Sequence, residues 1–358
     1  MKKLKNIATL LFAGITMIVM ILDTKTALSG AKEGLSLCIQ TAVPSLFPFF
    51  VFSSMINSTI LGKDLKFLSP IQKICRIPKG TESILLLGCI AGYPVGAQLI
   101  AQAHSEKQIS TATAQRMLGF CSNSGLSFIF GILSPMFHRP IIPWVLWGSH
   151  IISALLIGAI LPPVRSEASH IPTQKAISFE KAMQNALKNI SAISGWIILF
   201  RMIIAFCVKW FMWYFPENTQ VLLAGFLELS NGCLLLRSIP SEGLRFLFAS
   251  CILSAGGICV AMQTVSVTGT LGTGYYFPGK LLQTGFAVLL SILLQPVLFS
   301  QAERTNISFR VAALLIVCIV LLICFLNRKK LVAFVEKIRY NIIKSHQKGA
   351  TTCYSVKR

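Results

Sequence analysis

The sequence predicts an all-α polytopic membrane protein with two pseudo-symmetric, inverted repeats that contain broken or re-entrant helices. Three observations lead to this fold class. Hydrophobic residues make up 54% of the 358 residues, apolar segments follow one another along almost the whole chain, and several of those segments carry a polar, Gly-rich interruption. One soluble core would not need so much apolar surface, so the chain belongs in a bilayer, with about eight to ten membrane segments.

The formal net charge of +21 does not by itself indicate a nucleic-acid-binding protein. The basic residues lie mainly between and after the apolar segments, as in the cytoplasmic loops of membrane proteins. The basic tail still has the residue types that bind phosphates, but membrane topology explains most of the charge. We therefore do not expect nucleic acid as a partner.

The N-terminal residues 1–31 are expected to form a signal-anchor helix. Met1 to Asn6 carries three lysines, and the apolar run Ile7 to Leu22 follows. A signal peptide cleaved near Ala27 to Ala31 is the alternative, but the apolar run is long for one and a second membrane segment follows at once. We favour an uncleaved helix whose N-terminus is cytoplasmic.

Residues 32–163 form the first predicted repeat. Its first segment, Leu35 to Leu61, should bend at Pro44 and Pro48. The loop 62–81 carries five basic residues and one acidic residue, so it should be cytoplasmic. The last segment, Pro140 to Pro163, bears tryptophans near one end, as is typical of a membrane interface.

The stretch Gly88 to Gly131 is the part around which we expect the chain to be organised. Its two apolar segments carry the interruptions GYPVG, from Gly92, and SNSG, from Ser122. Backbone that Gly and Pro free inside hydrocarbon must find partners, so interrupted helices persist only when they are buried in protein or line a cavity. Such interruptions in both halves of a chain are the best sequence indication of a transporter's binding site.

The polar linker 164–176 separates this half from the second predicted repeat, 177–299. A last membrane helix is expected within 300–326. The basic tail 327–358 should be cytoplasmic, either as an amphipathic helix on the anionic inner leaflet or as a solvated tail. After the linker, the predicted membrane segments are Asn185 to Phe215, Leu222 to Leu236, Leu244 to Val267 and Lys280 to Phe299 in the second repeat, followed by Val311 to Leu326.

Three sequence blocks recur in the same order in both halves. GCIAGYPVGAQLIAQ matches GFLELSNGCLLLRS, CSNSGLSFIF matches ILSAGGICVAM, and PSLFPFFVF matches SAISGWIILF. Their order indicates an internal duplication. The two copies are inverted if each contains an odd number of spans.

Glu228 is the one carboxylate in the middle of an apolar segment. A charge at the centre of a membrane helix costs about 2.5–3.5 kcal/mol on insertion scales, so such residues usually face a cavity or a partner. We expect Glu228 to contact a solute or an ion, with Lys280 or Arg201 as its counter-charge. The alternative is a salt bridge or a protonated carboxyl that only ties two helices together.

Amide and hydroxyl side chains also gather at the interruptions. Such groups suit a neutral, hydrogen-bonding ligand such as a nucleoside, although each one taken alone serves equally well to join helices. The residues are Ser122, Asn123, Ser124, Asn231, Ser254 and Gln263.

Enzyme and metal signatures do not occur in the sequence. The histidines form no HExxH pair, there is no GxSxG or GxxxxGK[ST] motif, and acidic residues are scarce. The eleven cysteines include no CxxC pair and lie mostly in apolar runs, so they are most simply small buried hydrophobes. We expect no enzymatic activity, no cofactor and no metal site.

Five blocks of the chain, in order, are AVPSLFPFFVFSSM, GCIAGYPVGAQLI, QRMLGFCSNSGLSFIFG, GFLELSNGC and SAGGICVAMQTVSVTGTLGTGYYFPGKLLQ. In wording and order they resemble the sporulation integral membrane proteins of endospore-forming Firmicutes that contain nucleoside-recognition, or Gate, domains. The resemblance implies a multi-pass protein required for spore cortex formation, with a Gate domain shared with nucleoside and ferrous-iron transporters. By position, it singles out Gly92, Tyr93, Pro94, Gly96, Asn123, Ser124, Gly125, Glu228, Asn231, Gly232, Gly256, Gly257 and Gln263.

The expected function is the passage or sensing of a small polar solute, such as a nucleoside, across a membrane of the developing spore. The alternative is a membrane scaffold that recruits cortex-assembly machinery and transports nothing. The expected partners are the solute, the lipid bilayer with its anionic inner leaflet, and further copies of the chain or other sporulation proteins. The chain is expected in the cell membrane as a multi-pass protein, with both termini cytoplasmic.

Overall fold

The computed structural model describes residues 2–164, 176–301, 303–306, 308 and 311–312. Within these residues the ordered elements are helices, and no strand is present. Five of the helical segments are long and apolar enough to cross a membrane: Thr24–Ile60, Ile141–Ile160, Phe179–Trp210, Glu242–Leu271 and Tyr276–Leu298. The predicted all-α polytopic membrane protein is confirmed. Most of the linker and nearly all of the last helix and basic tail fall outside the described residues, and the total of eight to ten segments stays a prediction.

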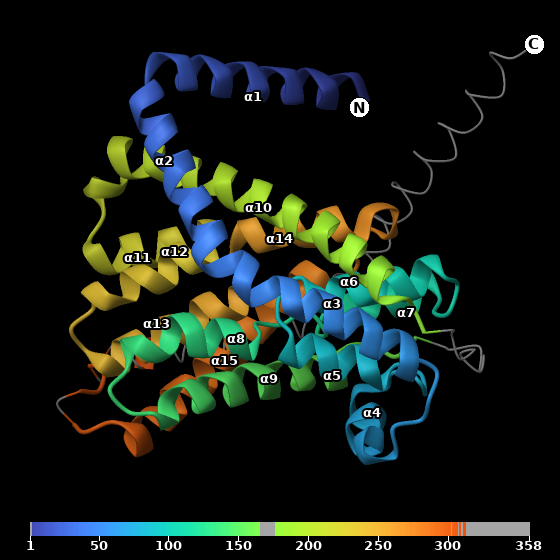
Figure 1. The fold of residues 1–358 in the computed structure, drawn as a ribbon. Coiled ribbons are helices and arrows are strands. Elements are labelled where there is room, and N and C mark those ends of the chain that lie inside the picture. The colour runs from blue at the N-terminus through green and yellow to red at the C-terminus, as the bar shows by residue number, and fades with distance from the viewer. Residues whose placement is uncertain (1, 165–175, 302, 307, 309–310, 313–358) are drawn as a thin grey trace, which may run out of the picture.

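The N-terminal helices meet at a sharp turn. α1 (Lys2–Leu22) ends at Asp23, whose carboxylate accepts a hydrogen bond from the backbone N–H of Thr26 at 3.3 Å and so caps α2 (Thr24–Leu37). Figure 1 shows α1 lying across the end of α2. The second apolar segment therefore starts at Thr24, eleven residues before the predicted Leu35, because the Asp23 cap starts a new helix there.

The rod Thr24–Ile60 is irregular in its middle. A π-helical turn, Cys38–Ala42, joins α2 to α3 (Val43–Ile60), and the backbone N–H of Val43 reaches back to the carbonyl oxygen of Cys38. The predicted irregularity near Pro44 thus takes the form of a wide turn just before the proline. Such π-helical turns are frequent at functional sites.

Helix α10 (Phe179–Trp210) packs along α2 and α3. An added Cβ at Gly30 would lie 2.8 Å from Cα of Met202, and one at Gly34 would lie 2.7 Å from Cα of Ile198. These glycines let the two backbones approach closely, as small residues do between membrane helices.

Two short helical hairpins replace full spans. α5 (Glu82–Ile90) packs against α6 (Val95–Ser105), and α11 (Glu217–Leu227) packs against α12 (Leu229–Leu235). Helices of 7 to 11 residues are only about 10–17 Å long, against a hydrocarbon core of about 30 Å. The predicted span Leu222 to Leu236 is therefore a helical hairpin too short to cross, because the chain reverses at Glu228.

Two further segments are broken in their middle. α7 (Thr111–Leu118) unwinds before α8 (Leu126–Phe128), which continues through the π-helical turn Ile129–Leu133. α13 (Glu242–Ala255) breaks at Gly256, which has φ +73°, and resumes as α14 (Gly257–Thr268). α9 (Ile141–Ile160) and α15 (Tyr276–Leu298) follow the two breaks, and the short α4 (Ser69–Cys75) of the basic loop packs on α9.

The same element order thus occurs in both halves: a hairpin, a broken helix and a long helix. Each hairpin is closed by two glycines that face the next broken helix, Gly88 and Gly96 against the carbonyl of Cys121, and Gly225 and Gly232 against each other and Ile252. The internal repeat itself stays a prediction, and so does the inverted orientation of the copies.

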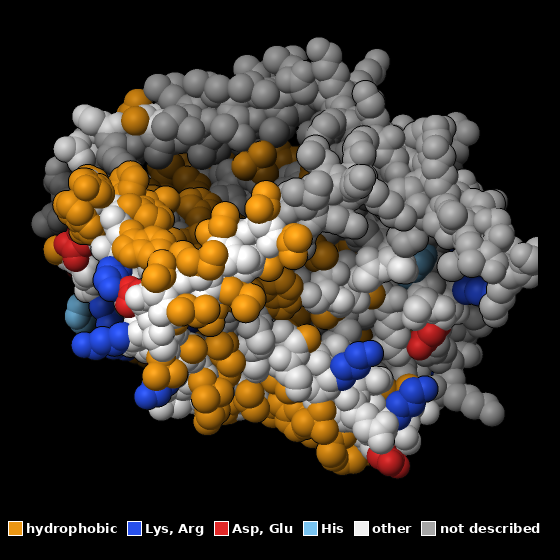
Figure 2. Space-filling view, turned by 90° about the horizontal axis from the view of Figure 1, so that it is seen from above, with side chains coloured by type: hydrophobic (Ala, Val, Ile, Leu, Met, Phe, Trp, Pro, Cys, Tyr) orange, Lys and Arg blue, Asp and Glu red, His pale blue; other side chains and the backbone are white. Residues whose placement is uncertain are grey.

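The outer face seen in Figure 2 is largely apolar across its middle, with charged side chains near its edges. Large exposed apolar residues on the helices include Leu28, Leu35, Ile39, Leu187 and Leu199. A soluble protein rarely exposes apolar surface this widely, whereas a lipid-facing surface requires it.

Candidate functional site

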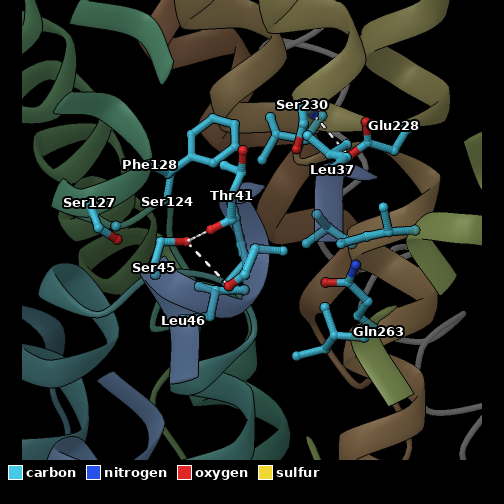
Figure 3. A pocket seen from close by; sticks show the side chains of 18 of the residues that line it. Leu37, Thr41, Ser45, Leu46, Ser124, Ser127, Phe128, Glu228, Ser230 and Gln263 are labelled. Atoms are coloured by element: carbon cyan, nitrogen blue, oxygen red, sulfur yellow. Dashed lines mark hydrogen bonds between the residues drawn. The ribbon is translucent and has the colours of Figure 1, made fainter. Parts of the chain in front are cut away.

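A small cavity lies where the helix breaks meet. Its volume is about 60 Å³. Figure 3 shows lining side chains from the segment Thr24–Ile60, from the start of α8, from the turn between α11 and α12 and from α14 around it. The turn between α5 and α6 and the middle of α10 complete the lining. Its polar lining residues are Thr41, Ser45, Tyr93, Ser124, Ser127, Glu228, Ser230 and Gln263.

The hydroxyls of this cavity fall into two groups. Ser45 Oγ donates to the carbonyl oxygen of Thr41 at 2.6 Å, so its donor is used inside the helix. Ser124 Oγ and Ser127 Oγ have no hydrogen-bond partner within the described part of the chain. A buried hydroxyl without a partner costs about 1–3 kcal/mol, so these two serines are the groups best placed to bind a polar occupant.

Glu228 forms part of the wall and caps its own half-helix. Its carboxylate accepts hydrogen bonds from the backbone N–H groups of Ser230 at 2.9 Å and Asn231 at 2.7 Å. A carboxylate at a helix N-terminus is stabilised by these amides and by the helix dipole. This local stabilisation explains how a charge only 3% exposed is held in an apolar segment.

The two predicted counter-charges of Glu228 differ: Arg201 lies near enough to interact with the carboxylate through space, whereas Lys280 binds elsewhere. Arg201 pairs with Glu33 at 2.7 Å and donates to the side-chain oxygen of Asn231, and Lys280 belongs to a separate cluster. Neither forms an ion pair with Glu228, because the start of α12 already supplies its hydrogen-bond donors.

A buried polar network lies beside the cavity. Lys280 Nζ donates to Tyr93 Oη at 3.0 Å, to Gln283 Oε1 at 2.6 Å and to the carbonyl oxygen of Ser122. The Gln283 amide then donates to Asn123 Oδ1 at 2.9 Å, while Asn123 donates to the carbonyl of Phe120 at 2.8 Å. Asn123 therefore ties the unwound segment to α15 and does not line the cavity.

His150 on α9 holds two of the breaks in place. Its Nε2 accepts the backbone N–H of Ser124 at 3.0 Å, so the proton lies on Nδ1, which is 2.9 Å from Ser254 Oγ. This arrangement identifies the neutral imidazole with a hydrogen on Nδ1. It joins the break before α8 to Ser254, two residues before the break at Gly256.

The structure brings part of the predicted site together. Six predicted residues line the cavity: Gly92, Tyr93, Ser124, Gly125, Glu228 and Gln263. The other predicted residues do not line it. Gly96 packs on Cys121, Gly257 packs on the carbonyl of Gly225, and Gly256 lies beside the Tyr93 ring. Pro94 lies in the turn before α6, Asn123 in the polar network, and Asn231 and Gly232 in α12.

Several functional residues were not predicted from the sequence. Thr41, Ser45, Ser127 and Ser230 line the cavity, and His150 and Gln283 join the network. His150 and Gln283 are polar residues inside predicted spans, the same signal that identified Glu228. The serines carried no such signal, because hydroxyls are common in membrane helices.

Comparison with known proteins gives one informative relative. No protein-family profile matches the chain, and no solved structure matches it. The chain is similar to the sporulation integral membrane protein YlbJ of Bacillus subtilis (strain 168), with 26% identity over 347 residues, covering 83% of this chain and 85% of the relative. The expected resemblance to YlbJ-like sporulation integral membrane proteins is confirmed, and the Gate domain stays a prediction.

Proposed function

From the likeness to a sporulation integral membrane protein, we propose that the chain passes or senses a small polar solute across a membrane of the developing spore. The observation that carries the proposal is the cavity at the helix breaks, with the unpartnered hydroxyls of Ser124 and Ser127 in its wall. Broken helices around a cavity that holds a few polar groups are the arrangement in which many secondary transporters bind their substrates. The role in spore cortex formation is proposed from the family resemblance.

The cavity size bears on the solute. About 60 Å³ is enough for a few water molecules, whereas pockets for drug-sized ligands measure about 300–1,000 Å³. A nucleoside therefore requires the hairpins to move apart. We propose that the structure is the closed state of the passage, and that the hairpin α5–α6 separates from α8 and α14 when the solute enters.

The lining favours a neutral or weakly cationic solute. Hydroxyl groups and the Gln263 amide supply donors and acceptors, and the Glu228 carboxylate supplies the charge. Part of that charge is offset by the amides of α12. An anionic solute would meet the carboxylate without a nearby free cation in the described lining.

A scaffold is the second candidate, and α1 favours it. The described side chains of α1 leave Leu10, Leu11, Ile15 and Ile21 more than half exposed. The helix packs mainly against α2, and its Val19 packs on a small cluster that includes Met202 and Phe206 of α10. A helix with such an exposed apolar surface suits contact with lipid or with another membrane protein. In this function the cavity would be a by-product of packing.

The test is solute-dependent thermal stability of the purified protein in detergent, with nucleosides, amino sugars and metal ions as probes. A bound probe at one hundred times its Kd should stabilise the protein by about 2.7 kcal/mol. Ser127→Ala should abolish the shift without destabilising the protein, since Ser127 Oγ has no internal partner. Ser191→Ala, on the exposed face of α10, is the matched control and should leave the shift intact.

A cavity-filling variant separates the two candidates in cells. Ser127→Trp should block passage and prevent cortex formation while the protein still accumulates in the membrane. Normal cortex formation with this variant, together with no probe shift in the folded wild type, would favour the scaffold.

A further inference from the structure

Lys280 is a buried cation whose hydrogen-bond partners are all uncharged. The residue is 4% exposed and lies in the first turns of α15. Its ammonium group donates to one phenol oxygen, one amide oxygen and one backbone carbonyl. The ion pairs found in the described residues all lie elsewhere. Burying an ion costs several kcal/mol even in relaxed proteins, so a charged Lys280 is energetically costly at this position.

The groups that face the ammonium come from every element packed around it. Cys89 and Tyr93 face it from the hairpin α5–α6, Cys121 from the unwound segment before α8, and His150 from α9. His150 is neutral in this arrangement, because its Nε2 accepts a backbone N–H. The described surroundings therefore provide oxygen acceptors and no negative charge.

The ammonium joins segments that must separate if the cavity is to open. Tyr93 belongs to the tip of the hairpin and Ser122 to the unwound segment, and one nitrogen binds both. Tyr93 Oη in turn donates to the carbonyl oxygen of Leu253 at 3.1 Å, close to the break at Gly256. Tyr93 also lines the cavity together with Ser124 and Gly125.

We propose that Lys280 is a proton-binding site that controls the cavity: the protonated side chain holds the breaks together, and the neutral amine releases them. On release, one Nζ–H bond breaks, its electron pair stays on nitrogen, and the proton passes to a water molecule. The amine then keeps two donors for three acceptors and loses the charge-assisted strength of each bond. Lysine suits this role because, unlike arginine, it can lose its proton when buried.

This inference rests on the proposed function for its link to solute passage, while the opening itself requires no solute. Protonation would select the closed conformation, in the same way that a ligand shifts a population toward the state it binds better. Movement of a solute through the cavity would then be accompanied by movement of a proton.

Hydrogen exchange of the full-length protein in lipid nanodiscs tests the proposal. Backbone exchange in peptides that cover residues 92–96 and 121–125 would be followed from pH 6 to pH 10 and corrected for the intrinsic pH dependence of exchange. In the wild type we expect the corrected rate to rise at least about tenfold across one titration, because local opening exposes the amides. A peptide from α10 should show no such rise.

Three variants identify the titrating group. Lys280→Arg should keep the slow rate at every pH, because arginine stays charged, and Lys280→Gln should exchange fast at every pH. Lys181→Gln, on the exposed face of α10, should behave like the wild type. If Lys280→Gln does not fold, the wild type and Lys280→Arg still decide the matter.

A pH-independent corrected rate in the wild type would overturn the proposal, as would the same pH-dependent rise in Lys280→Arg. The solute screen above is a separate measurement. If Lys280 titrates but no solute shifts the thermal stability, the proton switch stands and the transport function is removed. If a solute shifts the stability but Lys280 does not titrate, the transport function stands and the proton switch is removed.

Discussion

Single carbonyl oxygens fix how closely the hairpins approach the broken helices. The carbonyl of Cys121 sits between Gly88 and Gly96, where a Cβ at either position would overlap it. The obstacle is backbone and cannot rotate away, so these two positions require glycine for space. Gly256 requires it for its backbone angle instead, since its φ is +73°.

We predict that Gly96→Ala destabilises the protein by at least about 1–3 kcal/mol, the range for overpacking a well-packed core. Gly195→Ala is the control, because nothing lies within 4 Å of its Cβ position on α10. Alanine there should be neutral or stabilising by up to about 1 kcal/mol through helix propensity. Denaturant or thermal unfolding in detergent measures both, and equal stability of the two variants would contradict the packing argument.

At the scale of elements, one arginine fastens α7 to the end of α9. Arg116 is 2% exposed, and its guanidinium donates to the carbonyl oxygens of Gly158 at 2.6 Å, Pro162 at 2.9 Å and Leu161 at 3.2 Å. These are carbonyls at and beyond the helix C-terminus that have no partner in the helix itself. A planar group with several donors satisfies them together, and it also complements the negative end of the helix dipole.

We predict that Arg116→Lys lowers the free energy of unfolding by about 1.5–3 kcal/mol, because a single ammonium cannot reach the same set of carbonyls. Arg76→Lys changes an exposed side chain of the same type and should have little effect. Unfolding curves of the two variants in one detergent make the comparison. A loss shared equally by both would show that the fork of Arg116 is not what holds α9.

At the scale of the whole molecule, the helical segment Thr24–Ile60 determines which loops lie on opposite sides of the membrane. Lys209, near the end of α10, pairs with Asp23, and at the other end the backbone N–H of Ile177 donates to Ser58 Oγ at 3.2 Å. The two long helices therefore run antiparallel over their full length. The basic loop 62–81 lies at the end opposite to Asp23 and the aromatic cluster that follows α10.

We predict that Trp213→Cys is labelled by a membrane-impermeant thiol reagent from outside the cell and that Lys66→Cys is labelled only after the membrane is opened. The positive-inside rule places the basic loop in the cytoplasm. The wild type is the control, since six of its eight described cysteines are buried. Labelling of both positions from the same side would contradict the single crossing of Thr24–Ile60.

The fold class could be predicted from the sequence because the bilayer imposes simple demands on apolar length and on backbone hydrogen bonding. The interruptions at Gly92 and Ser122 were predicted for the same reason, and the break at Gly256 falls within the block that matches the second of them. The break at Glu228 was not predicted, because Leu222 to Leu236 was expected to be a single segment. The direction of each side chain at a break was not predictable. Asn123 turns away from the cavity because the Gln283 amide lies on its other side, and only the tertiary packing of α15 decides that.

The pairing of buried charges also needed the structure. Glu228 and Lys280 both lie in apolar surroundings, and opposite charges there would be expected to meet. Each instead has its own neutral partners, Glu228 at the start of α12 and Lys280 between the hairpin and the unwound segment. Backbone N–H groups next in the chain satisfy Glu228, whereas Lys280 is satisfied by a phenol, an amide and a carbonyl oxygen, two of them from distant segments, which sequence spacing does not reveal.

The short hairpins have an electrical consequence. Helices of 9 and 11 residues in α5 and α6 rise about 14 and 17 Å, roughly half of the hydrocarbon thickness. If the proposed passage admits water from both sides up to the hairpins, the insulating wall would be thin at the hairpin tips, and much of the membrane voltage would fall across them. A unit charge that crosses the full voltage gains about 2.3 kcal/mol per 100 mV, so a cationic solute or a proton at these tips would be driven by the membrane potential.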